Sequence, residues 1–342
     1  DIDSQTFDGV YSAGFEDHST TAIDLDKKDD AYDPQTYESL LGIRMPDGIA
    51  AFTVEGTTYL VTANEGDARE WGDEDLGTFY LSEDERDFGE EGVTSPTGAI
   101  TAENSGLEGK VVFFKTEDFD GLDSEKDYVF GGRSFTVFQV TQDGLEEVFT
   151  SGDDFEALTA QYVPEYFNAS NDNAVLDDRS GKKGPEAESV TVGAVDGKTY
   201  AFVALERTGG VMVYDITDPA HISFANYINS RDYSEDIAGD NSPEGLCFIP
   251  AGESWDGNAY LVAACEVSGT VAVYGASANT AYDPGTENPD DGQKPGDGDD
   301  QNPDDGQKPG TGGEDQKPGT ADSQTGGQNT SGKKAARTGD GS

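Results

Sequence analysis

The chain is poor in histidine, cysteine and basic residues, and each shortage narrows what it can do. Its 342 residues include 2 His, 2 Cys and only 21 Lys plus Arg, against 70 Asp plus Glu, which gives a formal net charge of −49. So few histidines disfavour a Ser-His-Asp site and a zinc centre. So negative a field repels nucleic acid and favours divalent cations and basic partners. We therefore expect no nucleic-acid partner.

Long apolar runs are also missing. No stretch reaches the ~18 to 20 residues of a membrane span, so no transmembrane segment is predicted, and the N-terminus lacks the basic, apolar pattern of a signal peptide. Two cysteines in a chain of this length do not make a disulfide framework. Cys247 and Cys265 are expected on the two strands of one hairpin, where they either pair or serve as small buried apolar residues.

What the sequence does contain is a repeat. Three times an acidic motif opens an apolar strand and a second carboxylate closes the strand that follows. Asp47 and Glu65 are 18 positions apart, as are Glu188 and Glu206, and Glu244 and Glu266 are 22 apart. In an antiparallel hairpin the start of the first strand and the end of the second lie side by side. Each repeat therefore places two carboxylates at one end of its own hairpin.

The pattern between these motifs predicts an all-β domain. Beyond the three hairpins, strands are expected at residues 110–115, 134–140, 146–150, 210–216 and 270–274, and helical periodicity is weak. Recurring sheets of three or four strands are typical of a β-propeller. The long interval from Glu65 to Glu188 is expected to hold another blade and long loops, including the acidic stretch at residues 67–92.

If the hairpins are blades around one axis, six carboxylates converge on one rim, and they need a cation or raised pKa values. Calcium, which takes 6 to 8 oxygen ligands, suits them better than zinc. The alternative is that they cap turns and pair with local arginines, such as Arg69 and Arg207. The predicted metal ligands are Asp47, Glu65, Glu188, Glu206, Glu244 and Glu266, with Asp67, Glu186, Arg69, Arg207 and His18 as further candidates.

The composition changes at about residue 279, which divides the chain into a β-propeller domain (1–279) and a disordered linker (280–342). From residue 281 onward there are 13 acidic and 6 basic residues, so most of the net charge belongs to the first part. The linker repeats PDDGQKPG and buries too little apolar surface to offset its ordering entropy. It ends in KKAARTGD, which resembles the Thr-Gly sorting signal of Gram-positive surface proteins without the usual Leu-Pro. That resemblance implies attachment to peptidoglycan.

Several stretches resemble one family, and the match covers nearly all of residues 10–276. These stretches lie at residues 59–72, 130–135, 177–180, 183–186, 205–219 and 266–270. The chain is similar to the choice-of-anchor I domain, a family that includes mesenchyme-specific cell surface glycoproteins of animals. The resemblance implies an extracellular propeller tethered to the cell surface. Family members usually carry further blades before the segment that matches residues 15–19, so a partial ring or a smaller one is implied here.

Two functions of different classes fit these observations. The first is a non-catalytic surface module whose carboxylate-lined face binds calcium and a ligand or surface partner. The second is a calcium-dependent phosphoesterase resembling propeller phytases, in which calcium holds phosphate and activates water. Phosphate binding would need several cations beside the metal, and the predicted rim offers few. The first function is therefore preferred.

Overall fold

The computed structural model describes residues 6–67 except residue 8, the backbone of 85–87, and residues 93–114, 116 and 121–277. The predicted linker at 280–342 and most of the acidic stretch at 67–92 lie outside these residues. The described part is mostly β, as the sequence predicts. Within it, no helix combines the length and apolar character needed to cross a membrane.

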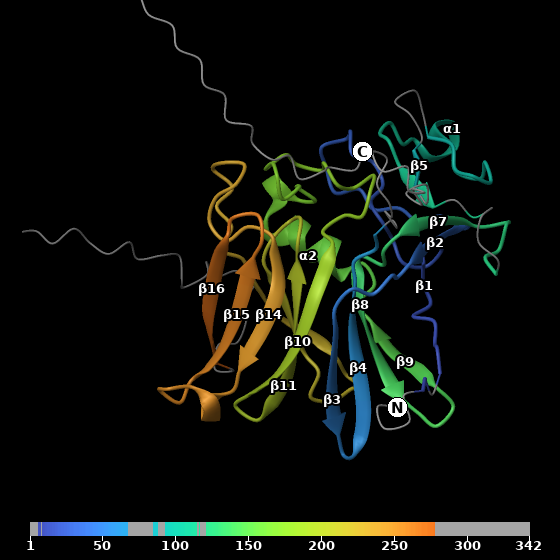
Figure 1. The fold of residues 1–342 in the computed structure, drawn as a ribbon. Helices are drawn as coiled ribbons and strands as arrows, with labels where there is room; N and C mark the ends of the chain where they lie inside the picture. Colours follow the sequence, from blue (N-terminus) through green and yellow to red (C-terminus); the bar gives the residue numbers. More distant parts are fainter. Residues whose placement is uncertain are drawn as a thin grey trace, which may run out of the picture. The chain divides into compact units, whose positions relative to one another are not determined.

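Three antiparallel sheets carry the three sequence repeats (Figure 1). The first has the order β3-β4-β8-β9, with β3 Ile49–Val54, β4 Thr57–Asn64, β8 Ser134–Val140 and β9 Leu145–Thr150. The second has the order β10-β11-β12-β13, with β10 Ala187–Val195, β11 Lys198–Leu205, β12 Val211–Asp215 and β13 Ser223–Ile228. The third is β14-β15-β16, with β14 Pro243–Ile249, β15 Ala259–Cys265 and β16 Thr270–Ala276. Each repeat supplies the first two strands of its sheet.

The remaining elements lie before the first repeat, between the first and second repeats or, for one 3-10 turn, between the two strands of the third hairpin. A small mixed sheet joins β1 Phe15–Asp17, β2 Leu40–Ile43 and β7 Asp127–Phe130, with β2 and β7 parallel. β5 Glu85–Asp87 pairs with β6 Val112–Phe114. The helices are α1 Ala102–Ser105 and α2 Asp154–Tyr162, and the 3-10 turns are η2 Pro164–Tyr166 and η3 Ala251–Glu253. The sequence pattern did not predict α2, which follows β9 directly.

The predicted blade between Glu65 and Glu188 is wrong. The strands expected at 134–140 and 146–150 are β8 and β9, but β8 pairs with β4 and completes the first sheet. The strand expected at 110–115 is the shorter β6, which pairs with β5. Sequence spacing suggested a separate unit because the chain leaves the first sheet after β4 and returns to it only at residue 134.

The three hairpins share a backbone conformation just before the first carboxylate. The residue two positions before each of these carboxylates has a positive φ: 39° at Met45, 54° at Glu186 and 64° at Ser242. The pairing register then slips between Ala187 and Val190 in the second sheet, and between Pro243 and Gly245 in the third. Such bulges re-aim a side chain. Side chains along a strand normally point to alternate faces of the sheet, and the bulges interrupt this alternation at Glu188 and Glu244, at the same end of the two sheets.

The sheets pack face to face around β10, which lies against β3 and β4 on one side and β14 on the other (Figure 1). Phe135, Phe155 and Tyr214 centre the core shared by the first two sheets. Burying one such side chain stabilises a fold by about 1.5–3 kcal/mol. Phe202 stacks on Phe248 at 5.5 Å between the second and third sheets. The sheets are therefore held at fixed positions, and so are the motif carboxylates at their ends.

Both cysteines are free. Cys265 is buried and pairs in register with Pro243, whereas Cys247 is exposed and pairs with Val262. The two residues lie at different heights of the β14–β15 ladder, so the disulfide alternative is not realised.

Gly48 is the point where the first and second repeats touch. A Cβ there would lie 2.7 Å from Ser189 Cα and 2.9 Å from the Glu188 carbonyl oxygen, and Gly48 N donates to that oxygen at 3.0 Å. Gly48→Ala is therefore expected to cost about 1–3 kcal/mol of unfolding free energy, because backbone has to move. Gly245 occupies the corresponding position in the third repeat with only Ala264 Cβ near, at 3.6 Å.

Gly245→Ala is the matched control for this prediction. Urea unfolding of both variants measures the difference, which we expect to lie almost entirely with Gly48. Equal stabilities for the two variants would show that the contact between the repeats is not rigid.

Candidate functional site

The structure brings the six predicted carboxylates together at one end of the three sheets. Glu188 and Glu244 are the second residues of β10 and β14, and Asp47 comes just before β3. Their partners directly follow the second strand of each hairpin: Glu65 after β4, Glu206 after β11 and Glu266 after β15. The arrangement repeats from sheet to sheet, because Glu206 N donates to Glu186 O and Glu266 N donates to Ser242 O, both at 2.8 Å.

Two overlapping groups of three carboxylates form the centre of the cluster. In the first, which we call the outer triad, oxygens of Asp47, Glu65 and Glu188 all lie within 4.8 Å of one another. In the second, the inner triad, the same holds for Glu65, Glu186 and Glu206. Glu65 belongs to both. Beside the outer triad an open pocket of about 420 Å³ is lined by Asp47, Glu188, Glu244, Gly245, Ala264, Cys265, Glu266 and Thr270.

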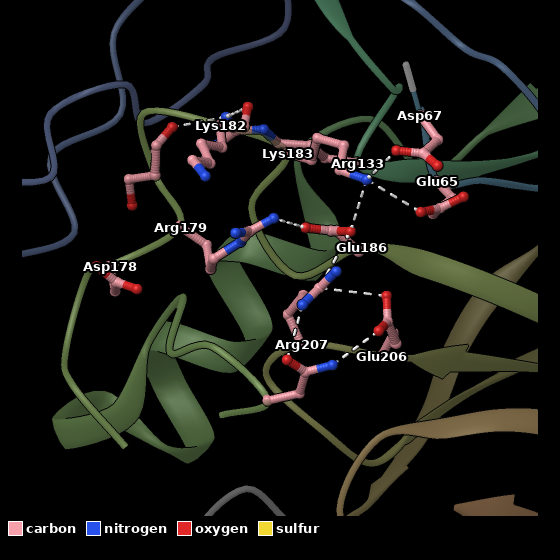
Figure 2. A network of polar contacts seen from close by, with 12 residues as sticks. Glu65, Asp67, Arg133, Asp178, Arg179, Lys182, Lys183, Glu186, Glu206 and Arg207 are labelled. Atoms are coloured by element: carbon pink, nitrogen blue, oxygen red, sulfur yellow. Dashed lines mark hydrogen bonds and ion pairs between the residues drawn. The ribbon is translucent and has the colours of Figure 1, made fainter. Parts of the chain in front are cut away.

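Three basic side chains converge on Glu186, which is fully buried in the inner triad (Figure 2). Lys183 Nζ lies 2.9 Å from its Oε2, Arg207 Nε lies 3.3 Å from the same oxygen, and Arg179 binds the other oxygen. Burial alone would raise the pKa of Glu186, but these cations outweigh it and lower the pKa to about 2. Glu186 is therefore ionised and already compensated.

A polar layer below Glu206 holds that carboxylate in place. Asn171 Nδ2 donates to Glu206 Oε1 at 2.8 Å, and Arg207 Nη1 donates to Asn171 Oδ1 at 2.7 Å. Arg207 Nε also lies 3.3 Å from Glu206 Oε2. These contacts fix the orientation of the Glu206 carboxylate at the end of the second hairpin.

The outer part of the cluster carries more negative charge than its described neighbours balance. In the described part of the chain, no lysine or arginine forms an ion pair with Asp47, Glu188, Glu244 or Glu266. Burial raises the pKa of Glu188 to about 9, and the negative charges of Glu65, Glu206, Asp47 and Glu244 add to the rise. Burial raises the pKa of Glu244 too, with contributions from Glu266 and Asp47.

Glu65 and Glu206 also have raised pKa values, but the increase is smaller than for Glu188. Burial and the nearby charge of Glu186 raise the pKa of each to about 7, against the opposing effect of Lys183. Without a bound cation, several of these carboxyl groups hold protons near neutral pH. A divalent cation would displace those protons and bind the ionised forms.

These raised pKa values predict how stability depends on pH. Glu65, Glu188 and Glu206 titrate near pH 4.5 in the unfolded chain and at about 7 to 9 in the fold. The folded protein therefore holds more protons than the unfolded chain, so its stability falls as pH rises across that interval. In the presence of a chelator we expect the melting temperature to drop from about pH 7 to about pH 8.5, and to drop less for Glu188→Gln. A melting temperature that rises over this range would contradict the assignment.

Of the further site candidates that the sequence analysis named, some lie at the carboxylate cluster and others do not. Glu186 and Arg207 lie in the inner triad's network, and exposed Asp67 contacts Lys183 Nζ at 3.1 Å. Arg69 lies outside the described residues. His18 belongs to neither triad nor the pocket: it follows β1, its Nδ1 donates to Thr21 O at 3.1 Å, and burial lowers its pKa to about 4. The predicted pairing with local arginine holds for Glu206 and Arg207, whereas the pairing predicted for Arg69 lies outside the described residues.

Sequence reasoning missed Lys183 and Asn171, which complete the inner network together with Arg179. All three come from the loops between α2 and β10, whose fold no repeat pattern specifies. One signal was available: Lys183 and Glu186 are three positions apart directly before the second repeat. A lysine three positions before a glutamate can form an ion pair with it.

The outer triad and pocket present a donor set rich in oxygen. Carboxylates dominate, Thr270 adds a hydroxyl, and the thiol of Cys265 is the one soft group among the pocket's lining residues. Hard cations such as Ca²⁺ prefer oxygen ligands and tolerate irregular geometry, whereas zinc prefers nitrogen and sulfur. The residues present therefore fit calcium.

Comparison with known proteins supplies two relatives and a family. The chain is 25% identical over 237 residues to a mesenchyme-specific cell surface glycoprotein of Strongylocentrotus purpuratus, an overlap of 60% of this chain and 30% of that protein. It is 27% identical over 165 residues to gigasin-3a of Magallana gigas, covering 44% of this chain and 57% of the relative. The chain thus spans less than two thirds of either relative.

The family assignment rests on a separate match. The model of the choice-of-anchor I domain matches residues 1–219, which include the first two repeats and the whole inner triad. Because this match extends over more than half of the sequence, the chain belongs to the choice-of-anchor I domain family.

Proposed function

We propose that the chain is an extracellular, surface-attached binding module whose carboxylate cluster binds calcium. Family membership and the similarity to a cell surface glycoprotein of Strongylocentrotus purpuratus support the surface location. The strongest single observation is the outer triad: three carboxylates within 4.8 Å, beside an open pocket, with no described cation at Asp47 or Glu188. A bound divalent ion would balance this charge.

In this proposal the three large sheets are neighbouring blades of a β-propeller. They follow one another in the chain, each begins with an inner strand, and these strands, β3, β10 and β14, lie next to one another (Figure 1). Their repeat-equivalent carboxylates then belong to one rim around a common axis. The pocket on that rim is where a ligand or surface partner would meet the ion.

The anchoring part of the proposal concerns the end of the chain. The composition change at about residue 279 supports a domain followed by a linker. We propose that the linker is a stalk that joins the domain to peptidoglycan through its Thr-Gly motif.

Calcium titration of the full chain by calorimetry tests the proposed site. Glu188→Gln keeps size and hydrogen bonding but removes one ligand charge, so it should weaken calcium binding by at least tenfold, or about 1.4 kcal/mol. Glu253→Gln, on the exposed turn η3, is the control and should leave binding unchanged. Binding that is equally strong in both variants would place the ion elsewhere.

The second function, phosphoester hydrolysis, finds less support in the site. Arg179, Lys183 and Arg207 are the described cations nearest the triads, and all three are engaged by Glu186. None is left to hold a phosphate beside the metal. The calcium-loaded chain is therefore expected to leave a generic phosphomonoester intact, and calcium-dependent turnover would reverse the preference.

A further inference from the structure

Lys183 places an ammonium group among three carboxylates (Figure 2). Its Nζ lies 2.9 Å from Glu186 Oε2, 3.1 Å from Glu65 Oε1 and 3.1 Å from Asp67 Oδ1. A lysine ammonium group is charged at neutral pH, and three carboxylates surround this one. It lies beside two members of the inner triad, Glu65 and Glu186, where it would repel a metal ion bound between them.

Glu65 connects this lysine to the outer triad. Lys183 contacts Oε1 of Glu65, and Glu65 is also one of the three carboxylates of the outer triad. A divalent ion in the inner triad would lie within a few ångströms of the ammonium group, where like charges repel strongly in a buried setting. It would also have to break the contacts that Lys183 already makes with Glu65 and Glu186.

We propose that Lys183 is a built-in cation that closes the inner triad to divalent ions and leaves the outer triad as the calcium site. This inference rests on the proposed calcium binding and adds to it the number and position of the ions. Lys183 thereby determines which of the two triads can bind calcium. It occupies the inner triad and holds Glu65, which belongs to both triads, in a fixed orientation.

Calcium stoichiometry of the full chain, measured by calorimetry with a folding check by circular dichroism, tests this inference. Lys183→Met removes the ammonium group at similar length and should add one calcium ion to the number bound by the unsubstituted chain. Lys183→Arg keeps the charge and should leave the number unchanged. The double variant Lys183→Met with Glu186→Gln removes a ligand charge together with the cation, so it should lose the added ion.

The outcomes separate this inference from the proposed function. If Glu188→Gln weakens calcium binding but Lys183→Met binds no extra ion, calcium binding stands and the role of Lys183 is overturned. If Glu188→Gln has no effect while Lys183→Met gains an ion, the outer site is wrong and Lys183 still blocks the inner one. Should Lys183→Met fold only with calcium, the ion replaces the lost charge as expected. A variant that stays unfolded at millimolar calcium would overturn the inference.

Discussion

Millimolar calcium is expected to raise the melting temperature of this chain, with the outer triad as the cause. An ion present at ~100 times its dissociation constant, bound only by the folded state, adds about 2.7 kcal/mol to the free energy of unfolding. For a domain of this size that corresponds to roughly 5–10 °C. The gain should grow from about pH 6 to about pH 8, because Glu188 and Glu65 have raised pKa values and must lose protons to bind the ion.

Thermal melts with calcium and with chelator, at constant ionic strength, measure this effect. Constant ionic strength matters because a chain with net charge −49 gains stability from any added salt. Glu188→Gln should show a reduced calcium effect and a higher melting temperature in chelator, since it removes a crowded carboxylate. Identical midpoints with and without calcium would remove the metal hypothesis.

Arg133→Met is expected to destabilise the fold by about 3–5 kcal/mol, the usual cost of breaking a buried ion pair from one side. Arg133 and Glu156 are both almost fully buried, and Arg133 Nη1 lies 2.6 Å from Glu156 Oε1. The guanidinium group also donates to the carbonyl oxygens of Asp24 at 2.7 Å, Ser180 at 2.7 Å and Lys182 at 2.9 Å. It therefore ties the start of β8 to α2 and to the loop that carries Lys183.

Chemical denaturation measures this loss, and Lys198→Met is the matched control. Lys198 forms an ion pair of similar length with Asp215, at 2.8 Å, but its side chain is 56% exposed. Exposed ion pairs contribute little to stability, so the control should lose little. Similar losses in the two variants would mean that burial does not set the strength of the Arg133 pair.

The carboxylates of the site could be predicted because the pairing of two strands in a hairpin brings the start of the first strand next to the end of the second. Asp47 and Glu65 must meet when β3 and β4 pair, and Glu188 and Glu206 must meet when β10 and β11 pair. The strands expected at 134–140 and 270–274 coincide with β8 and most of β16 for the same reason. Local alternation of apolar and polar residues was sufficient there.

The parts that could not be predicted depend on contacts between distant segments. Lys183 reaches Glu65, 118 positions away in the sequence, only because the loop before β10 folds back to the end of β4. Arg133 pairs with Glu156, which lies on α2, a helix that its weak apolar periodicity concealed. The blade expected after Glu65 failed because spacing along the chain does not say which earlier strand a later strand will join.

The interrupted first sheet also affects the order of folding. The second and third sheets form from consecutive strands joined by short turns, whereas β4 finds β8 only after residues 65–133 have been looped out. Loop closure of that length costs entropy before any contact repays it. The first sheet should therefore close late, and Asp47 and Glu65 reach Glu188 only near the end of folding. An ion bound there would act mainly by slowing unfolding, with little effect on the rate of folding.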